Sequence, residues 1–315
     1  MMNLLISKRE MQSDDIVVLD LVDPDSRTLP AFQPGAHIDI EVEPGLVRQY
    51  SLCSDPAERN LYRLGILKSS ESRGGSRLIH ERFREGELVR AGEPRNLFPL
   101  NMDAPQSILV GGGIGVTPMI SMAYALYAAG KSFELHYCAR TRSRAAFLQE
   151  LASAPFAHHV YLHFDDEEEG QRFNAAAHLP DPANGSHVYV CGPAGFMTWL
   201  HEQARSRGFR EENLHQEFFN AEVSTQGKAF EVVLARSGKS VTVAEGQTIV
   251  AALSHIGVRV NVSCEQGICG TCLCTVLSGE PDHRDSYLTD EEKAENDQIM
   301  VCCSRSKGPT LVLDL

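Results

Sequence analysis

The sequence lacks any run of about 18 apolar residues, and its first residues, MMNLLISKREM, do not sustain an apolar segment. These absences argue against a membrane-spanning helix and a secretory signal peptide, so we expect a cytoplasmic protein. Positive charge is also scarce, because 29 Lys and Arg face 42 Asp and Glu for a net charge of −13. That balance argues against nucleic-acid binding, which requires basic patches. The 315 residues, 43% of them hydrophobic, contain no repeat or low-complexity tract and predict two or three globular domains.

Cysteine is rare in the first two thirds of the chain and gathers near its end. Cys264, Cys269, Cys272 and Cys302 follow the spacing C-x4-C-x2-C-x29-C, which is typical of the ligands of a plant-type [2Fe–2S] cluster. Zinc is the alternative occupant of four cysteines, but its sites usually pair two short C-x2–4-C knuckles. The other five cysteines are scattered or lie beside ligands, which favours a reducing compartment over disulfides.

Two glycines and two further cysteines accompany the predicted ligands. We expect Gly267 and Gly270 to let the loop bend around the inorganic core, because glycine carries no Cβ. Alternation along a strand would point Cys274 and Cys303 away from the ligands near them. Both are therefore predicted to be bystanders.

Residues 1–102 predict an antiparallel β-barrel, because short alternating or apolar runs are separated by Pro, Gly and Asp turns. The predicted strands are 15–23, 37–43, 48–54, 62–68 and 86–94. Arg48 and Tyr50 share one face of a strand, with Ser51 at the next pleat. Arg73-Gly74-Gly75-Ser76 then opens a predicted helix over 77–83, where unpaired N–H groups and the helix dipole favour an anion. Taken alone, each pattern is more often plain surface or a simple helix cap.

Residues 103–225 predict a parallel α/β layer, because apolar strands alternate with helical patterns. The predicted strands are 107–113, 133–140, 160–166 and 187–193, and the predicted helices are 118–130, 145–154 and 194–208. In the loop after the first strand, Gly113 and Gly115 would let the backbone approach a pyrophosphate, and Pro118 suits the first helical turn. The alternative for this loop is a tight strand-to-helix turn.

Two further segments follow strands of this predicted sheet. Cys191-Gly192-Pro193 lies at a strand's carboxyl end, where open parallel sheets bind ligands, although Cys191 is also typical of a small buried residue. Asp165 is the first of five consecutive acidic residues, most of which are expected in a solvated loop. Because Asp165 lies at the end of its strand, its carboxylate would reach a ribose hydroxyl. A short apolar strand is predicted over 217–220.

Residues 226–315 predict an α+β β-grasp domain, which follows a polar linker over 221–228. Its predicted strands are 230–235, 240–245, 271–277 and 311–315, and its predicted helices are 247–257 and 289–296. This layout encloses the cysteine loop near one corner. The whole chain is thus expected to be multidomain.

In this order, Arg-x-Tyr-Ser, Gly-Gly-Ser, GGGIGVTP, CGP and C-x4-C-x2-C resemble the phthalate dioxygenase reductase family over essentially all 315 residues. The resemblance implies an FMN-binding barrel over 1–102, an NAD-binding domain over 103–225 and a plant-type [2Fe–2S] ferredoxin domain over 226–315. For the flavin it implies Arg48, Tyr50, Ser51, Ile66, Leu67, Lys68, Gly74, Gly75, Ser76, Thr117 and Phe219. For the dinucleotide it implies Gly112, Gly113, Gly115, Pro118, Arg140, Asp165, Cys191, Gly192 and Pro193. Phe218 is the alternative to Phe219 beside the ring.

The resemblance further implies an NADH-dependent oxidoreductase, the reductase component of a two-component Rieske oxygenase. Electrons would pass from NADH through FMN and the cluster to an oxygenase that hydroxylates or demethylates an aromatic or similar small compound. No catalytic acid or base is assigned, because the cofactors carry the chemistry. Two alternatives stay open. One is a flavin reductase or nitric-oxide scavenger that works alone, and the other is a non-enzymatic electron-carrier or redox-sensing module.

We expect a monomer that meets its oxygenase transiently. The charged residues near the cluster are Glu265, Glu280, Asp282, Asp285, Arg284 and Arg305. Their acidic excess predicts a negative docking face that steers a basic partner.

The nucleotide preference depends on two opposing groups. Asp165 would repel a 2′-phosphate and favours NADH over NADPH. The arginines that would attract such a phosphate are Arg140, Arg142 and Arg144.

Overall fold

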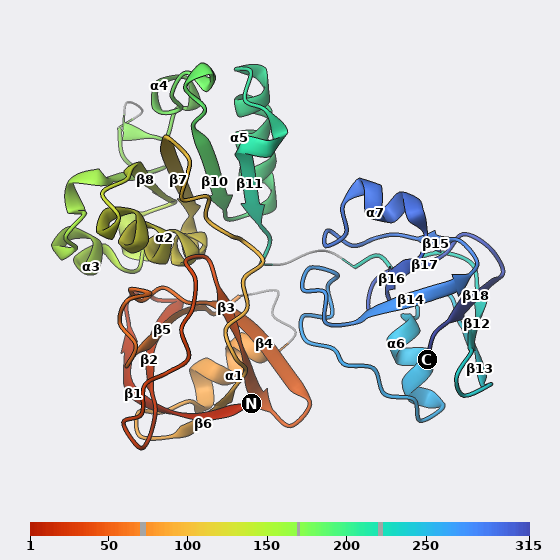
Figure 1. Cartoon of the computed structure of the whole chain (residues 1–315). Coiled ribbons are helices and arrows are strands. Elements are labelled where there is room, and N and C mark those ends of the chain that lie inside the picture. The colour runs from red at the N-terminus through yellow and green to blue at the C-terminus, as the bar shows by residue number, and fades with distance from the viewer. Residues whose placement is uncertain (70–73, 169–170, 220–222) are drawn as a thin grey trace. The chain divides into compact units, whose positions relative to one another are not determined.

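The computed structural model describes residues 1–69, 74–168, 171–219 and 223–315. The chain divides into two compact units, Met1–Phe219 and Asn220–Leu315 (Figure 1). The domain limits that we expect at 102/103 and 225/226 remain predictions. Among the described residues, no helix combines the length and the hydropathy that a passage through a bilayer requires.

The first sheet is a nearly closed antiparallel barrel of six strands in the order β4-β3-β6-β1-β2-β5, which confirms the predicted barrel. Its strands are β1 Met2–Met11, β2 Ile16–Val22, β3 His37–Glu43, β4 Leu46–Ser51, β5 Tyr62–Leu67 and β6 Leu88–Ala91. Helix α1, Gly75–Arg82, follows β5. Arg73, which we placed just before this helix, lies outside the described residues.

Strand β1 is absent from the predicted strands, although its sequence carries the signal. Leu4 and Ile6 are fully buried and alternate with less buried neighbours, as a half-buried strand requires. Strand β1 pairs with both β2 and β6 and is therefore central to the barrel.

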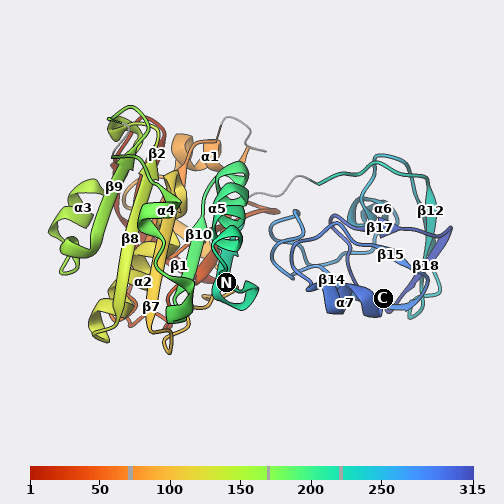
Figure 2. The same ribbon diagram turned by 90° about the horizontal axis from the view of Figure 1, so that it is seen from above.

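The second sheet has five parallel strands in the order β11-β10-β7-β8-β9, which confirms the predicted α/β layer. The strands are β7 Gln106–Gly112, β8 Ser132–Ala139, β9 Val160–Phe164, β10 His187–Cys191 and β11 Leu214–Glu217. Helices α2 Val116–Ala128 and α3 Leu148–Ser153 pack on one face. Helices α4 Ala175–His178 and α5 Ala194–Ser206 pack on the other, with α5 alongside β10 in Figure 2. Short 3-10 helices are η1 Gly113–Gly115, η2 Arg142–Arg144, η3 Ala157–His159, η5 Pro182–Asn184 and η6 Glu211–Asn213.

Two predicted elements in this region differ from the structure. The strand predicted over 217–220 was wrong in its bounds, because β11 ends at Glu217, before the two phenylalanines, and residue 220 lies outside the described residues. The helix predicted over 145–154 begins only at Leu148, since Phe147 has a left-handed φ of 64°. The Phe147 ring packs over Gly65 of β5, where a Cβ would lie 2.8 Å from it. Tertiary packing thus overrides the helical pattern at this position.

The barrel and the parallel sheet are tied into one unit. A single buried core cluster takes residues from β2, β7 and α2. Arg63 on β5 binds Asp20 of β2 at 2.7 Å and Glu150 of α3 at 3.0 Å. The Gly35 N–H donates to the Ser121 hydroxyl of α2 at 3.1 Å. The flavin and nucleotide regions therefore share a continuous interior.

The second unit is built on a five-stranded sheet in the order β13-β12-β18-β14-β16, with the short pair β15-β17 beside it. Its strands are β12 Phe230–Leu234, β13 Ser240–Val243, β14 Leu273–Ser278, β15 Pro281–Asp282, β16 Gln298–Met300, β17 Arg305–Ser306 and β18 Thr310–Leu313. Its helices are α6 Ile249–His255 and α7 Asp290–Glu295. All six predicted elements are present, whereas β15, β16 and β17 are additional. The linker predicted over 221–228 begins outside the described residues.

Candidate functional site

The four predicted ligand cysteines converge in the second unit. Cys264, Cys269 and Cys272 come from the loop between α6 and β14, and Cys302 follows β16. The thiol of Cys264 lies within hydrogen-bonding reach of those of Cys269 and Cys302, and Cys302 also reaches Cys272. Each of the four is between 2% and 6% exposed. Four buried sulfurs from one tight loop and one distant segment form the donor set that a [2Fe–2S] core needs.

The loop also supplies hydrogen bonds to these sulfurs. The Gln266 N–H donates to Cys264 Sγ at 3.3 Å, and the Thr271 hydroxyl lies 3.2 Å from Cys269 Sγ. Such bonds stabilise thiolates and tune the potential of a cluster. Glu265, between the first ligand and Gln266, is exposed, so the loop lies at the surface of its unit. The residues therefore fit the group, and these four cysteines would hold it.

Two features of the structure favour glycine at positions 267 and 270 of the loop. Gly267 and Gly270 have φ of 72° and 73°, which glycine adopts readily. A Cβ at Gly267 would overlap the Cys303 thiol, and one at Gly270 would overlap the Tyr287 ring. Glycine at both positions thus lets the loop pack closely against Cys303 and Tyr287. Cys274 lies on β14, whereas Cys303 lies in a turn after β16, so strand alternation does not account for Cys303.

Two of the six charged residues predicted near the cluster, one acid and one base, are buried, and the acidic excess of two stays a prediction. Asp285 and Arg305 are 6% and 2% exposed and do not contribute to the surface. The Asp285 carboxylate accepts from the Leu288 N–H and the Ser304 hydroxyl, which ties the segment before α7 to the turn that carries Cys302.

The other charges near the loop are mostly paired. Arg284 binds Asp282 at 2.9 Å, and Lys307 binds Glu280 at 2.7 Å. Glu265 is exposed within the ligand loop itself and adds its carboxylate to the surface there. Helix α7 adds three acids in its first turn, and it begins three residues after Tyr287, whose ring covers Gly270.

In the first unit, the structure brings together the two patterns predicted for a flavin phosphate. The Arg48 side chain from β4 lies against Gly75 at the start of α1, where a Cβ would lie 2.6 Å from its Cγ. Gly74 has a φ of 99°, and the Ser76 hydroxyl accepts from the Ser69 N–H at 3.4 Å. A guanidinium beside a helix N-terminus suits a monophosphate.

Tyr50 and Ser51 occupy opposite sides of β4. Tyr50 packs against the barrel core, and burial raises the pKa of its phenol. The Ser51 hydroxyl donates to Glu217 Oε2 at 3.3 Å, across from the end of β11. Burial raises the pKa of Glu217 to about 8, and the Cys191 thiol is close enough to be affected by its charge. No sequence pattern marks Glu217 as part of this region.

The three residues predicted along the flavin's ribityl chain, at the end of β5 and just after it, differ in exposure. Ile66 is fully buried in the barrel core, and its carbonyl bonds to the His80 ring at 2.9 Å. Leu67 is partly buried and Lys68 is exposed. Thr117 is 1% exposed, its hydroxyl donates to the Ile114 carbonyl at 2.9 Å, and its methyl group lies against β5.

The two glycine loops predicted for the dinucleotide interlock at the ends of β7 and β10. A Cβ at Gly115 would overlap the Cys191 carbonyl oxygen, and one at Gly192 would lie 3.0 Å from Gly112 Cα. By contrast, Gly113 has a φ of 57° and open space at its Cβ position. Pro118 lies in the first turn of α2, as predicted. The backbone around Gly113 is therefore the part of these loops that a pyrophosphate could approach.

Arg140 and Asp165 follow the ends of neighbouring strands, and the Asp165 N–H donates to the Ala139 carbonyl at 3.1 Å. Both side chains are exposed at the same edge of the sheet. Arg142 binds Glu167 at 3.1 Å and lies over the Phe164 ring at 4.5 Å. The third arginine of this group is also paired, since Arg144 binds Asp15 at 2.8 Å.

Phe218 and Phe219 point to different cores. Phe219 packs against the cluster that includes α2 and the barrel strand β2, whereas Phe218 packs against the α4–α5 face. This arrangement supports Phe219 as the residue beside the flavin, which stays a prediction.

Two family models match the chain. The 2Fe-2S iron-sulfur cluster binding domain matches residues 232–307, and the oxidoreductase NAD-binding domain matches residues 109–202. Over 317 residues and 100% of both chains, the sequence is 47% identical to vanillate O-demethylase oxidoreductase from Pseudomonas sp. (strain HR199 / DSM 7063).

Solved structures agree with these matches. Phthalate dioxygenase reductase, described as modular for electron transfer from pyridine nucleotides to [2Fe–2S], is 39% identical with a TM-score of 0.76 and covers 100% and 98% of the two chains. An intact type IV self-sufficient cytochrome P450 monooxygenase gives 39% identity and a TM-score of 0.86, and this chain spans 41% of that chain.

The fold and site define a pyridine-nucleotide-dependent iron–sulfur flavoprotein reductase. The chain belongs to the phthalate dioxygenase reductase family. Its cofactors are NADH, FMN and a [2Fe–2S] cluster, and it is an electron-transfer reductase of an oxygenase system.

Proposed function

We propose that this reductase serves a Rieske-type oxygenase that removes the methyl group of a methoxylated aromatic acid. The observation that carries the proposal is the 47% identity to a vanillate O-demethylase oxidoreductase over the full length of both chains. In that reaction O₂, NADH and one proton convert an aryl methyl ether into a phenol, formaldehyde, water and NAD⁺.

The cofactors supply the conversion of a two-electron hydride into single electrons. The residues of this chain bind and orient them. Arg48 and the start of α1 would hold the FMN phosphate, the backbone around Gly113 the pyrophosphate, and Phe219 the flavin's nicotinamide side. Asp165 would take a ribose hydroxyl.

The test combines this reductase with its cognate oxygenase component and supplies vanillate and NADH. We expect formaldehyde and the phenol to form in step with NADH oxidation. Oxidation of NADH without formaldehyde, at rates unchanged by the oxygenase, would contradict the proposal and favour a flavin reductase that works alone. Absence of NADH oxidation even with cytochrome c would favour the electron-carrier or sensing module.

A haem oxygenase is a second candidate partner, and the TM-score of 0.86 to the self-sufficient P450 favours it. The absorption spectrum of the cognate oxygenase separates the two candidates. A Soret band that shifts with carbon monoxide would support a P450 partner, and its absence with an iron–sulfur spectrum would support the Rieske type.

NADH is the proposed electron donor in preference to NADPH. Arg142 and Arg144 are engaged by Glu167 and Asp15, so Arg140 is the arginine of this group that opposes the repulsion of a 2′-phosphate by Asp165. The ratio of kcat/KM for the two nucleotides tests this, and a tenfold preference for NADPH, about 1.4 kcal/mol of barrier, would contradict it. We further propose a monomeric, cytoplasmic reductase whose complex with the oxygenase is too transient to survive a sizing column.

A further inference from the structure

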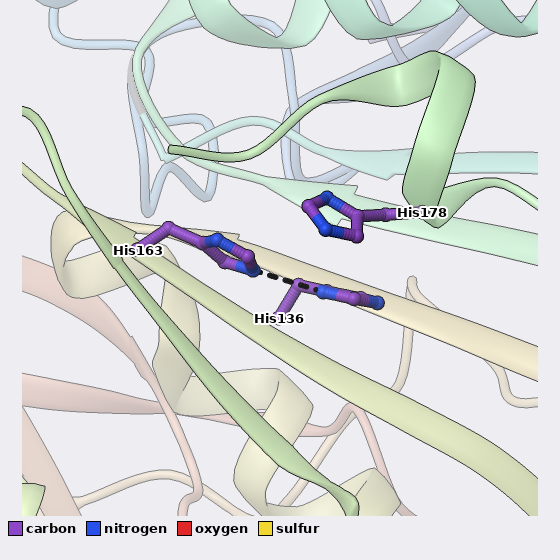
Figure 3. A group of neighbouring side chains, drawn as sticks. All are labelled: His136, His163 and His178. Atoms are coloured by element: carbon purple, nitrogen blue, oxygen red, sulfur yellow. Dashed lines mark hydrogen bonds between the residues drawn. The ribbon is translucent and has the colours of Figure 1, made fainter. Parts of the chain in front are cut away.

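Three histidines meet away from the sites described above, on the face of the parallel sheet that α4 covers. His136 lies on β8, His163 on β9 and His178 at the end of α4, and their rings converge in Figure 3. One nitrogen from each ring lies within 4.8 Å of the other two. His136 and His163 are 1% and 7% exposed, whereas His178 is only partly buried.

The outer nitrogens of the two buried rings face acceptors. His163 Nδ1 lies 2.8 Å from the Gln171 carbonyl oxygen, and His136 Nε2 lies 3.1 Å from the Glu134 carboxylate. Carbonyl and ionised carboxylate oxygens only accept hydrogen bonds, so each outer nitrogen carries a proton. Metal-binding histidines usually donate their second N–H to such partners.

The inner nitrogens therefore present lone pairs to each other. His136 Nδ1 and His163 Nε2 are 3.0 Å apart, and two neutral acceptors at this distance require a cation between them. That cation is either a proton or a metal ion. Both rings are buried, which disfavours a charged imidazolium between them. Neutral rings are the form in which histidine binds a metal.

Ring packing alone does not account for this arrangement. His136 stacks on Tyr161 with centroids 5.1 Å apart, and Phe173 meets His136 edge-on at 5.2 Å. These contacts explain why the rings are buried, but not why two lone pairs face each other.

We propose that His136, His163 and His178 form a binding site for Zn²⁺ or a similar divalent transition metal. The ligands are His136 Nδ1, His163 Nε2 and His178 Nε2, with water in the fourth position. Tetrahedral Zn²⁺ with nitrogen at 2.0–2.1 Å places neighbouring ligands about 3.3 Å apart, so the buried pair needs to open by only about 0.3 Å. His178, on the exposed side, moves inward to complete the set, and the ion enters past it.

One hydrogen bond opposes binding. The Asn174 N–H donates to His178 Nδ1 at 3.0 Å, which leaves the ring proton on Nε2. Coordination moves this proton to Nδ1 and breaks that exposed bond, so the affinity is lower than if all three outer nitrogens donated. The metal would tie the neighbouring strands β8 and β9 to α4.

The test uses the full-length holoprotein without an affinity tag, with its flavin and its two cluster irons confirmed. The protein is equilibrated with Zn²⁺, desalted and analysed for zinc and iron by mass spectrometry, and its thermal unfolding is followed with and without Zn²⁺. We expect about one zinc per chain beyond the cluster irons, together with a higher Tm that EDTA reverses. Activity is not needed for either readout.

Variants distinguish this site from the cysteines and from surface histidines. His178→Gln, at the least buried ligand, should raise the Kd for Zn²⁺ at least tenfold while leaving the flavin and iron content unchanged. The matched control is His158→Gln, an exposed histidine of the same unit, which should bind zinc like the unaltered protein. Unaltered protein that holds no zinc would overturn the proposal and leave a shared proton between the rings. Equal zinc binding by the His178→Gln variant would overturn it as well.

Discussion

The two compact units hold their cofactors by different means. In the second unit the predicted ligands are side chains, four cysteines whose spacing is visible in the sequence. In the first unit the predicted contacts are largely backbone, at the start of α1, at Gly113 and along β5. A set of side-chain ligands can be recognised in a sequence by a spacing that few other structures produce. A backbone binding site is marked in the sequence only by glycines, and glycines also occur in turns and at close packing contacts.

The largest effect is expected from a truncation that separates the two units, in which the chain ends at Phe219. We expect it to keep NADH-driven flavin reduction but to lose roughly a hundredfold in cytochrome c reduction, because the cluster carries the single-electron step. The first unit has its own core clusters, so it should fold alone. Stopped-flow flavin bleaching and cytochrome c assays measure the two activities. Loss of flavin reduction would show that the second unit supports the first.

Within the second unit, neighbouring cysteines should differ strongly. Cys302→Ser removes a predicted ligand and should lower the bound iron to about a tenth or less. Cys303→Ser is the matched control, because its thiol packs on Gly267 and occupies none of the four ligand positions. Iron analysis and the visible spectrum report the outcome. Equal iron loss in both variants would mean that the turn, not the ligand, was the sensitive feature.

Within the first unit, neighbouring glycines should differ as well. Gly115→Ala places a methyl group on the Cys191 carbonyl and should cost about 3 kcal/mol of the free energy of unfolding. Gly113→Ala meets only open space and the left-handed φ of 57°, which costs about 1 kcal/mol. Urea unfolding followed by flavin fluorescence compares the two. Similar costs at both positions would contradict the packing role of Gly115.

Stability of the first unit should depend on pH through Glu217. Its pKa rises on folding from 4.5 to about 8, so between these values the native state holds a proton that the unfolded chain has released. The free energy of unfolding therefore falls as pH rises through this window, by at most about 1.4 kcal/mol per pH unit from this residue, and levels off above it. Glu217→Gln should flatten that slope. An unchanged slope in denaturant titrations from pH 5 to about pH 9 would assign the dependence to other groups.

The smallest expected effect concerns docking at the cluster loop. Glu265→Gln, within the ligand loop, should slow coupled turnover about twofold at low ionic strength, and the difference should vanish near physiological salt, where the Debye length is about 8 Å. Glu280→Gln should do less, because Lys307 already neutralises that carboxylate. Turnover with the cognate oxygenase across a salt series measures both. Equal sensitivity of the two variants would mean that a carboxylate within the ligand loop affects docking no more than one outside it.

The features that could be predicted from the sequence are those with a local pattern. The barrel, the parallel sheet and the convergence of the four cysteines could be predicted because period, alternation and spacing are local features of the sequence. Strand β1 also carries a local signal, the alternation of Leu4 and Ile6, but charged residues follow it directly and weaken the pattern. The kink at Phe147 could not be predicted, since its cause is Gly65 on another strand.

Charged residues were the hardest to place. Glu217 acquires its environment from Ser51, 166 residues earlier, so no local pattern shows that its carboxyl is buried. Arg305 looks like a surface cation in sequence, yet it donates to the carbonyls of Lys228 and Ala244 at 3.1 and 3.2 Å and lies over the Phe230 ring. Burial of a charge depends on which distant segments surround it, and a single sequence does not record that.

The parallel pairing of β12 with β18 has a consequence for synthesis on the ribosome. Glu231 to Leu234 align with Thr310 to Leu313, and the Arg305 guanidinium joins residues 227 and 228 from the other end of the unit. Strand β12, the first strand of this unit, therefore has no parallel partner until β18 has emerged from the ribosome. The first unit has by then been translated in full. The scaffold of the cysteine loop therefore closes only after β18 has been translated, whereas all strands of the first unit are translated before that point.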